Sequence, residues 1–210
     1  MMTNYKSLRE EMVQNQLKSR GINDQNVIDA FSKVQRENFV PDNLKKFAYS
    51  DNPLPIGHNV TISQPYIVAL MCQILDIKKN HKILDIGTGS GYQAAILSQL
   101  CDSVISIEVI PELADQASER LRRLGYHNIK VIHADGTDGY PEEAPYHGIK
   151  TAAATPKVPD AWKNQIIKGG KIVFPKSKGI YQELIELRKK NGSFIEKKHG
   201  KVRFVPLVNS

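Results

Sequence analysis

The segment that most limits the fold of this chain lies at residues 83–92. It reads Ile-Leu-Asp-Ile-Gly-Thr-Gly-Ser-Gly-Tyr, so a short apolar run leads directly into three closely spaced glycines. The pattern predicts a buried strand, a tight turn and then a helix over residues 91–101. Glycines in such a turn allow positive φ and a close approach of a ligand, and the helix begins with unpaired N–H groups. A nucleotide-like ligand is therefore expected at the carboxyl end of this strand.

The chain beyond residue 82 repeats this alternation of strand and helix, which is typical of a parallel sheet covered on both faces. Strands are predicted at residues 83–86, 104–107, 129–132, near 149 and at 171–174, and helices at 91–101, 111–124 and around Trp162. The last part of the chain differs because no gap is long enough for a helix. There, residues 182–188, 194–197 and 202–207, linked by Asn191-Gly192 and Gly200, predict antiparallel strands that close the sheet edge.

The N-terminal part has a different pattern. Apolar residues recur at helical spacing over residues 5–20, and Asp24 is suited to cap a second helix. Residues 38–60 contain several prolines and predict an irregular segment. We treat the chain as a single domain, with an N-terminal helical extension and irregular loop at residues 1–60 and a core at residues 61–210.

Composition excludes several classes of protein. With 210 residues, 40% of them hydrophobic and 24% charged, the chain can bury its own core and is neither disordered, collagen-like nor a coiled coil. Its two cysteines, Cys72 and Cys101, have neither metal-ligand spacing nor the pattern of a disulfide framework. Residues 1–20 lack the apolar stretch of a secretion signal or a membrane span. We therefore expect a soluble, cytoplasmic protein.

The formal net charge of +7 raises the question of a nucleic-acid partner. Residues 1–162 carry a net charge of −2 and residues 163–210 a net charge of +9, so the excess lies in the closing strands. No recognised motif interleaves aromatic residues with these basic ones. A solvated basic edge is therefore favoured over a nucleic-acid interface.

The glycine spacing discriminates between nucleotide ligands. The dinucleotide fingerprint needs a glycine where Tyr92 stands, and the Gly-Lys-Ser/Thr of a P-loop is absent. What remains is Asp85 before the turn and Glu108 about 20 residues on, where a carboxylate can accept from ribose hydroxyls. Asp85 would repel a pyrophosphate but suits a sulfonium or ammonium group, which favours S-adenosylmethionine over NAD. The plainer alternative is a turn merely shaped by glycine, with Glu108 a solvated strand end.

Several segments together resemble the protein-L-isoaspartate O-methyltransferase family, the repair enzymes that methylate abnormal aspartyl carboxyl groups. The glycine turn is shared by many methyltransferases, whereas Thr-Ile-Ser-Gln-Pro-Tyr at residues 61–66 and Val-Pro-Leu at residues 205–207 are more specific. The resembling segments follow the family's order and span nearly the whole chain. They are residues 54–57, 61–69, 83–95, 134–136, 143–146 and 202–208.

The resemblance implies an α/β fold, namely a Rossmann-like S-adenosylmethionine-dependent methyltransferase sandwich with a mostly parallel sheet, antiparallel C-terminal strands and an N-terminal helical extension. It implies S-adenosylmethionine as donor, S-adenosylhomocysteine as product, and damaged peptides and proteins with isoaspartyl residues as partners. Neither nucleic acid, membrane nor metal is expected, and the oligomeric state stays open. By match of motif Ser63 takes the place of the active-site hydroxyl. The implied donor-binding residues are Thr61, Ile62, Ser63, Gln64, Asp85, Gly87, Gly89, Glu108, Val109, Asp135 and Gly136, and the implied substrate-binding residues are Ala153, Ala154 and Val208.

The chemistry of the implied reaction asks for positioning more than for proton transfer. An isoaspartyl carboxyl has a pKa of about 3.9, so it is an anion at neutral pH and needs no general base. Holding this anion in line with a sulfonium methyl can contribute about 7–11 kcal/mol. Ser63 can donate a hydrogen bond that orients the carboxylate. It is also predicted to cap the helix that Pro65 begins.

Three positions depart from the family pattern. His147 stands where the family ordinarily has Asp, and Asn59-Val60 replaces the usual Gly-Gln, so that this loop is expected to differ. Lys150 falls in a strand that should be buried, where an unpaired ammonium is costly. Either the register shifts by one residue, or Lys150 reaches a cavity mouth or a carboxylate such as Asp135.

Two alternative functions stay open from the residues alone. One is a methyltransferase of the same fold with another acceptor, such as RNA or a small molecule. The other is a donor-binding homologue with weakened activity, which the departures at His147 and Lys150 would favour. A further hypothesis is that the basic C-terminal edge attracts substrates that gained negative charge through damage.

Overall fold

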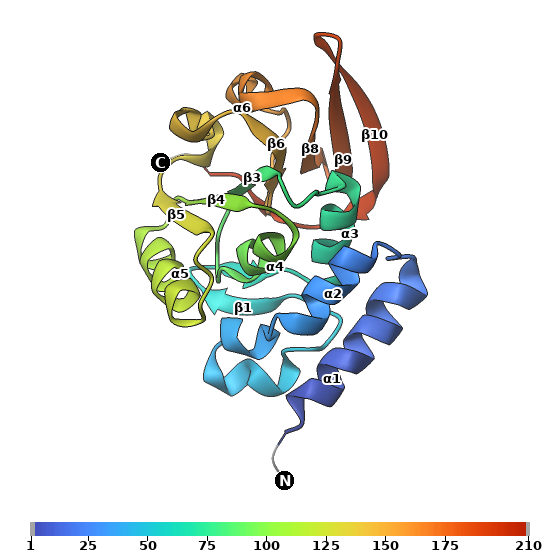
Figure 1. The fold of residues 1–210 in the computed structure, drawn as a ribbon, viewed down its shortest axis with the longest axis vertical. Helices are drawn as coiled ribbons and strands as arrows, with labels where there is room; N and C mark the ends of the chain where they lie inside the picture. Colours follow the sequence, from blue (N-terminus) through green and yellow to red (C-terminus); the bar gives the residue numbers. More distant parts are fainter. Residues whose placement is uncertain (1–2, 209–210) are drawn as a thin grey trace.

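The computed structural model describes residues 3–208, which form a central seven-stranded sheet (Figure 1). Its strand order is β10-β9-β8-β6-β3-β4-β5. The bounds are β3 Lys82–Ile86, β4 Ser103–Glu108, β5 Ile129–His133, β6 Tyr146–Thr151, β8 Ile166–Lys178, β9 Tyr181–Lys190 and β10 Ser193–Val202. The five strands from β8 to β5 are parallel, and β9 and β10 add to their edge antiparallel. The predicted mostly parallel sheet is confirmed.

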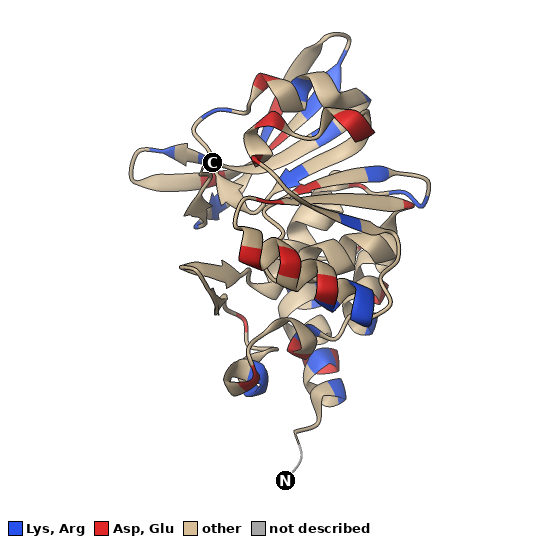
Figure 2. Ribbon diagram, turned by 90° about the vertical axis from the view of Figure 1, so that its left-hand side faces the viewer, with Lys and Arg blue, Asp and Glu red and all other residues tan. Residues whose placement is uncertain are grey.

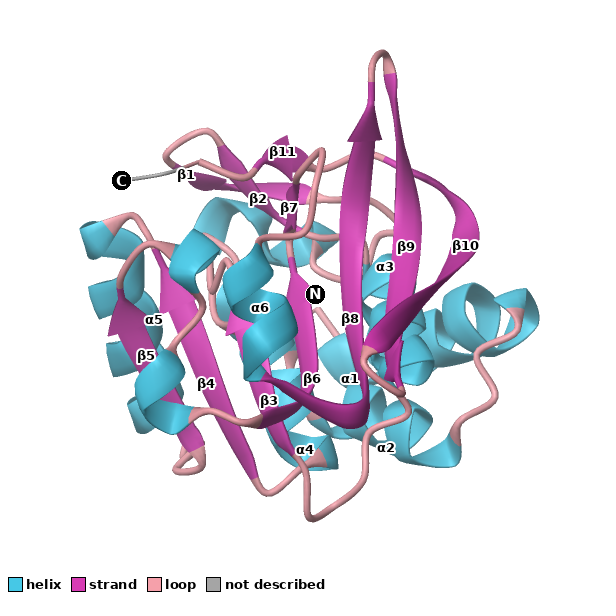
Figure 3. Ribbon diagram, turned by 90° about the horizontal axis from the view of Figure 1, so that it is seen from above, coloured by secondary structure: helices cyan, strands magenta, loops and turns pink. Residues whose placement is uncertain are grey.

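Helices cover both faces of this sheet because its strands are apolar on both sides. Ile83 of β3 points into the core shared with α3 (Pro65–Leu75) and α4 (Tyr92–Leu100). Leu84 points to the opposite core, where Trp162 of α6 (Asp160–Gln165) is fully buried. Figure 3 shows α6 in front of the central strands, with α5 (Pro111–Arg123) beside β5. No described helix is long and apolar enough to cross a membrane.

The N-terminal helices pack beneath the sheet (Figure 1). Helix α1 (Tyr5–Met12) continues through a π-helical turn and a 3-10 turn to Arg20. Helix α2 (Gln25–Lys33) follows, with Asp24 at its N-cap as predicted. The Asp24 carboxylate accepts from the N–H groups of Asn26 and Val27. Leu17 and Phe31 share one core cluster with Val104 of the sheet. A single core thus spans the N-terminal extension and the rest of the chain. The boundary placed at residue 60 stays a prediction.

Residues 38–60 hold more regular structure than the prolines predicted. Two 3-10 turns, at Arg36–Phe39 and Asp42–Phe47, lead to a hairpin of β1 (Leu54–Gly57) and β2 (Val60–Ile62). The hairpin turn places His58 and Asn59 at φ of 50° and 59°. Asn tolerates this region and Val does not, so the positive φ falls on the residue before Val60.

The expectation of a third antiparallel strand at residues 202–207 is wrong. Gly200, at φ +108°, lies in a bulge that places one extra residue between Lys198 and Lys201 of β10. Beyond β10 the chain leaves the sheet edge, and β11 (Val205–Pro206) pairs in parallel with β7 (Ala153–Ala154) in a separate two-stranded sheet. The C-terminal segment thus crosses the carboxyl end of the parallel strands.

Candidate active site

The glycine turn lies where β3 ends, as the sequence predicted. The N–H groups of Gly87 and Thr88 both donate to the carbonyl oxygen of Ile107, at 2.8 and 3.0 Å, and attach the turn to β4. Gly87 has a φ of +87°, which a residue with a Cβ adopts only at a cost. Of the turn residues, Gly87 and Gly89 are half-buried, so their backbone can be approached where α4 begins.

Glu108 ends β4 beside this turn and is only 6% exposed. One carboxylate oxygen, Oε2, accepts from the N–H of Gly89 at 2.8 Å, and the other accepts from Val109 and Ile110 at 3.0 and 3.1 Å. Three backbone donors therefore fix the carboxylate, and Oε2 retains a free acceptor position. Glu108 is a fixed acceptor at the turn, not a solvated strand end.

A narrow cavity of about 100 Å³, here the inner pocket, lies between the glycine turn and the crossing C-terminal segment. Its walls are largely apolar, with Ile107 and Leu207 among them, and Glu108 supplies its one acidic group among the described residues. Gly136 forms part of the wall, and a Cβ added there would lie 2.4 Å from the Ile86 side chain. The predicted residues that line the inner pocket are Thr61, Gly87, Gly89, Glu108, Val109, Gly136, Ala153 and Val208.

A larger cavity of about 880 Å³, here the outer cleft, adjoins the inner pocket. Thr61, Ala152 and Val205 line both cavities, so these three residues mark where they meet. Ser63 and Gln64 line the outer cleft alone. A group held in one cavity can therefore meet a group held in the other at Thr61, Ala152 and Val205, with Ser63 on the outer-cleft side.

The predicted helix cap at Ser63 is wrong. Gln64 occupies the N-cap position of α3, one residue later, and no side chain caps the helix. The Gln64 amide instead donates to the Asp51 carboxylate at 2.8 Å. The half-buried Ser63 hydroxyl forms no hydrogen bond with residues 3–208, so it remains available to a ligand in the outer cleft.

Four predicted residues line neither cavity. Two of them pack in the interior and a third caps a turn. Ile62 and Ala154 are buried, with Ala154 paired to Pro206 of β11. Asp135 caps the 3-10 turn Gly136–Asp138, where its carboxylate accepts from the N–H and hydroxyl of Thr137 at 2.8 and 2.7 Å. The fourth residue is Asp85.

Asp85 faces the core. Its fully buried carboxylate forms an ion pair with the fully buried ammonium of Lys150, its register partner on β6. Ser106 donates to the other Asp85 oxygen at 2.8 Å, and the Ser106 hydroxyl lies 2.6 Å from that of Thr88. A row of buried polar groups, the Lys150 row, therefore runs from β6 to the glycine turn. It explains how the turn is supported from below.

This row corrects two expectations from the sequence. Lys150 pairs with Asp85 and not with Asp135, because residues in register on neighbouring strands project side by side from one face. No shift of register is needed to place the ammonium. The negative charge of Asp85 is also balanced within the core, so the fixed carboxylate that faces the inner pocket is that of Glu108.

The other departure, His147, has a structural explanation. Its Nδ1 accepts the Lys82 N–H at 3.0 Å, and its ring stacks on that of His81 with centroids 4.5 Å apart. Burial, followed by the neighbouring His147, lowers the pKa of His81. Both rings lie where β3 and β6 begin, at the opposite end of these strands from the glycine turn.

Sequence reasoning missed several residues of the site. Ala152 and Val205 mark the junction of the cavities, and Arg20, Lys201 and Arg203 line the outer cleft. Arg203 and Val205 lay within the C-terminal motif, which could have indicated them. Arg20 and Lys201 gave no signal, because only the packing of distant segments brings them to the cleft.

The chemistry of the inner-pocket lining, rather than its volume of about 100 Å³, suits S-adenosylmethionine. It offers apolar walls for an adenine, a fixed carboxylate for ribose hydroxyls, and a glycine backbone for the amino-acid part. No group of three or more His, Cys, Asp or Glu gathers as a metal site within residues 3–208. A Rossmann-like sheet with this pocket defines the class of S-adenosylmethionine-dependent methyltransferases.

Comparison with known proteins narrows the class. The model of the family "Protein-L-isoaspartate(D-aspartate) O-methyltransferase" matches residues 7–210. Relatives named protein-L-isoaspartate O-methyltransferase are 48% identical over 200 residues in Methanoculleus marisnigri (95% of this chain, 91% of that one) and 49% identical over 207 residues in Syntrophobacter fumaroxidans (99% and 97%). The chain belongs to this family. It is accordingly an S-adenosylmethionine-dependent enzyme that methylates isoaspartyl residues.

Solved structures agree with this assignment. One from Plasmodium falciparum, described as a protein-L-isoaspartate O-methyltransferase in complex with S-adenosyl-L-homocysteine, superposes with a TM-score of 0.84 at 28% identity and covers 100% of both chains. A second protein-L-isoaspartate O-methyltransferase superposes with a TM-score of 0.85 at 28% identity. It covers 94% of this chain and 65% of its own. The fold is therefore that of the family from end to end.

Proposed function

We propose that this chain starts the repair of damaged proteins by binding the methyl donor in the inner pocket and the isoaspartyl residue in the outer cleft. The observation that carries the proposal is that the two cavities meet at Thr61, Ala152 and Val205, and that Ser63 lines the outer cleft. When bound, S-adenosylmethionine supplies an electrophilic methyl group on a positively charged sulfur. The chain's own residues hold donor and acceptor in line.

On the donor side, Glu108 accepts hydrogen bonds from the ribose hydroxyls. Its carboxylate is already oriented by three N–H groups, so little ordering is needed on binding. Val109 and Gly136 line the place of the adenine, and the missing Cβ of Gly136 lets its backbone lie against Ile86. Gly87 and Gly89 allow the amino-acid part to approach the turn. The Lys150 row supports that turn through Thr88.

On the acceptor side, Ser63 donates its hydroxyl hydrogen to the isoaspartyl carboxylate. The carboxylate is an anion at neutral pH, so no residue has to remove a proton. Among the described lining residues of the outer cleft there is no Asp or Glu, so the incoming anion meets no like charge there. Ser63 acts by fixing which carboxylate oxygen faces the methyl group. Because the serine hydroxyl is a neutral hydrogen-bond donor, that oxygen stays nucleophilic.

The environment of the two cysteines supports a cytoplasmic setting for this activity. Cys72 and Cys101 are buried and unpaired. Burial raises the pKa of both thiols to about 12, so both stay protonated. Buried thiols that form no disulfide are typical of a reducing compartment.

The activity is tested by methyl incorporation from S-adenosylmethionine into an isoaspartyl peptide and into its normal aspartyl twin. We expect turnover of the isoaspartyl peptide alone. Binding of S-adenosylhomocysteine, measured by calorimetry, separates the alternatives. Donor binding without turnover of either peptide would contradict the proposed function and favour a donor-binding homologue or another acceptor.

A further inference from the structure

The outer cleft has an uneven charge. Basic side chains line it from two distant parts of the chain, Arg20 at the end of the first helical segment and His199, Lys201 and Arg203 around the end of β10. No acidic side chain of the described residues lines it. By contrast, the outward face of α5 carries the exposed acids Glu112, Asp115 and Glu119 (Figure 2). The lining of the outer cleft therefore carries basic side chains without any acidic one, unlike this face of α5.

Two of these basic side chains are balanced by carboxylates. Arg20 pairs with Asp51 at 2.9 Å and lies over the Tyr66 ring at 3.6 Å, and His199 lies 2.9 Å from a Glu186 oxygen. These contacts hold the walls of the cleft. They place a carboxylate beside each of these two side chains.

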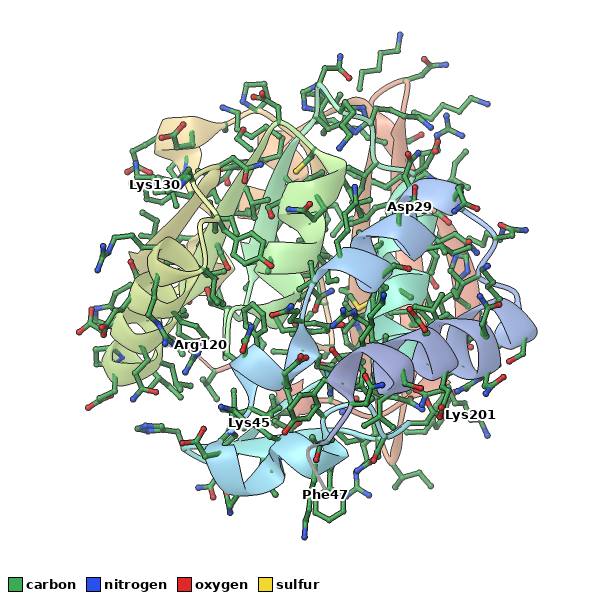
Figure 4. The ribbon with its side chains drawn as sticks, turned by 60° about the horizontal axis from the view of Figure 1, so that its bottom comes forward. Asp29, Lys45, Phe47, Arg120, Lys130 and Lys201 are labelled. Atoms are coloured by element: carbon green, nitrogen blue, oxygen red, sulfur yellow. The ribbon has the colours of Figure 1, made fainter. Side chains whose placement is uncertain are left out.

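The other two are not balanced. Within residues 3–208 neither Lys201 nor Arg203 forms an ion pair with an Asp or Glu side chain, and both are exposed. Lys201, labelled in Figure 4, lies 5.7 Å from the centre of the Tyr181 ring. The cleft therefore presents a surplus of two positive charges that no described residue neutralises.

The backbone that carries these two side chains is held in place. Gln182 of β9 accepts from the Phe204 N–H at 2.6 Å and donates to the Phe204 carbonyl at 3.0 Å. The next residue, Val205, lines both cavities. The backbone that carries Arg203 is thus held one residue from this clamp, while its exposed side chain lines the outer cleft.

These charges do not suit the reacting carboxylate itself. A cation bound to that carboxylate would withdraw its negative charge and repel the positively charged sulfur of the donor. We infer that Lys201 and Arg203 instead bind acidic residues next to the isoaspartyl residue, so that the enzyme prefers damaged sites in acidic sequence. The inference rests on the proposed function and names the class of polypeptide that this cleft selects. Exposed ion pairs of this kind change affinity about two- to fivefold per charge at low salt.

The test uses three isoaspartyl peptides of equal length in which the flanking residues are Glu, Gln or Lys. We expect kcat/KM to fall in that order, mainly through KM, and the difference to shrink when ionic strength rises from about 0.05 M to about 0.5 M. In the Lys201→Gln/Arg203→Gln variant the ratio between the Glu and Gln peptides should fall about fourfold to 25-fold, as two attractive charges are lost. The Gln182 clamp uses backbone groups of Phe204 and is not altered.

A matched control is Lys168→Gln/Lys190→Gln, which removes the same charge from exposed positions outside the outer cleft. This control should keep the wild-type preference. Equal kcat/KM on the three peptides, or an equal loss of preference in the control, would overturn the inference while leaving methylation intact. Failure to methylate any of the three peptides would contradict the proposed function and the inference together.

Discussion

The inner pocket and the outer cleft are built in different ways. The inner pocket takes most of its lining from the ends of β3 and β4 and from the segments that follow β3, β4, β5 and β6, with the rest from β2 and residues 205–208, and it is narrow and carries the Glu108 carboxylate. The outer cleft joins the N-terminal helices, the segment after β2 and the end of β10, and it is wide and basic. Parallel strands end at one edge of a sheet, so the donor pocket follows from local order. The acceptor cleft depends on the packing of segments far apart in sequence.

Variants in the Lys150 row should have the largest effect, and it should be on the free energy of unfolding. They test the structural support of the glycine turn and not the binding of a ligand. Lys150→Met leaves the buried Asp85 carboxylate without its partner, which typically costs about 3–5 kcal/mol of unfolding free energy. The double variant Lys150→Met/Asp85→Asn should recover most of this loss, since Asn can still accept from Ser106. Urea unfolding measures both. A loss below about 1 kcal/mol for Lys150→Met would contradict the assigned ion pair.

Glu108→Gln should affect the inner pocket alone. Gln keeps one acceptor oxygen but lacks the charge, and a hydrogen bond to a charged group contributes about 1.5–3 kcal/mol. We expect S-adenosylhomocysteine to bind at least about tenfold more weakly by calorimetry, with the peptide KM nearly unchanged at saturating donor. Glu112→Gln, at an exposed position on α5, serves as the control. Equal weakening by the two variants would remove Glu108 from donor binding.

A change in the stacked pair His81 and His147 should have the smallest effect, on the pH dependence of the unfolding free energy. It should not alter binding in either cavity. Because the pKa of His81 is lowered below its ordinary 6.5, the unfolded chain takes up a proton first as the pH falls. Stability should therefore be complete above pH 6.5 and decrease as the pH falls below it. His81→Asn keeps an acceptor for the Lys78 N–H without titrating, so its unfolding free energy should depend less on pH between 7 and 5. An unchanged slope would contradict this role.

The contrast between the cavities also explains what could be predicted from the sequence. Apart from the short β7 and two 3-10 turns, the strands and helices from residue 82 to 190 and the residues around the glycine turn are predicted by the sequence, because period and glycine position are local signals. The β1–β2 hairpin, the bulge at Gly200 and the crossing of β11 were not, since they depend on tertiary pairing. The sequence assigns Asp85 to the ligand because it shows an acid near the end of a strand before the glycine turn but does not show its partner Lys150.

The final measurement concerns Ser63, which lines the outer cleft two residues along the chain from Thr61, where the two cavities meet. The account predicts that Ser63→Ala lowers kcat for an isoaspartyl peptide about tenfold or more, the loss of one hydrogen bond to a charged group, while S-adenosylhomocysteine binds within about twofold of wild type. Single-turnover methyl transfer and calorimetry on the same preparation give both values. Equal losses in transfer and in donor binding, or no loss of transfer, would contradict the assignment of donor to the inner pocket and acceptor to the outer cleft.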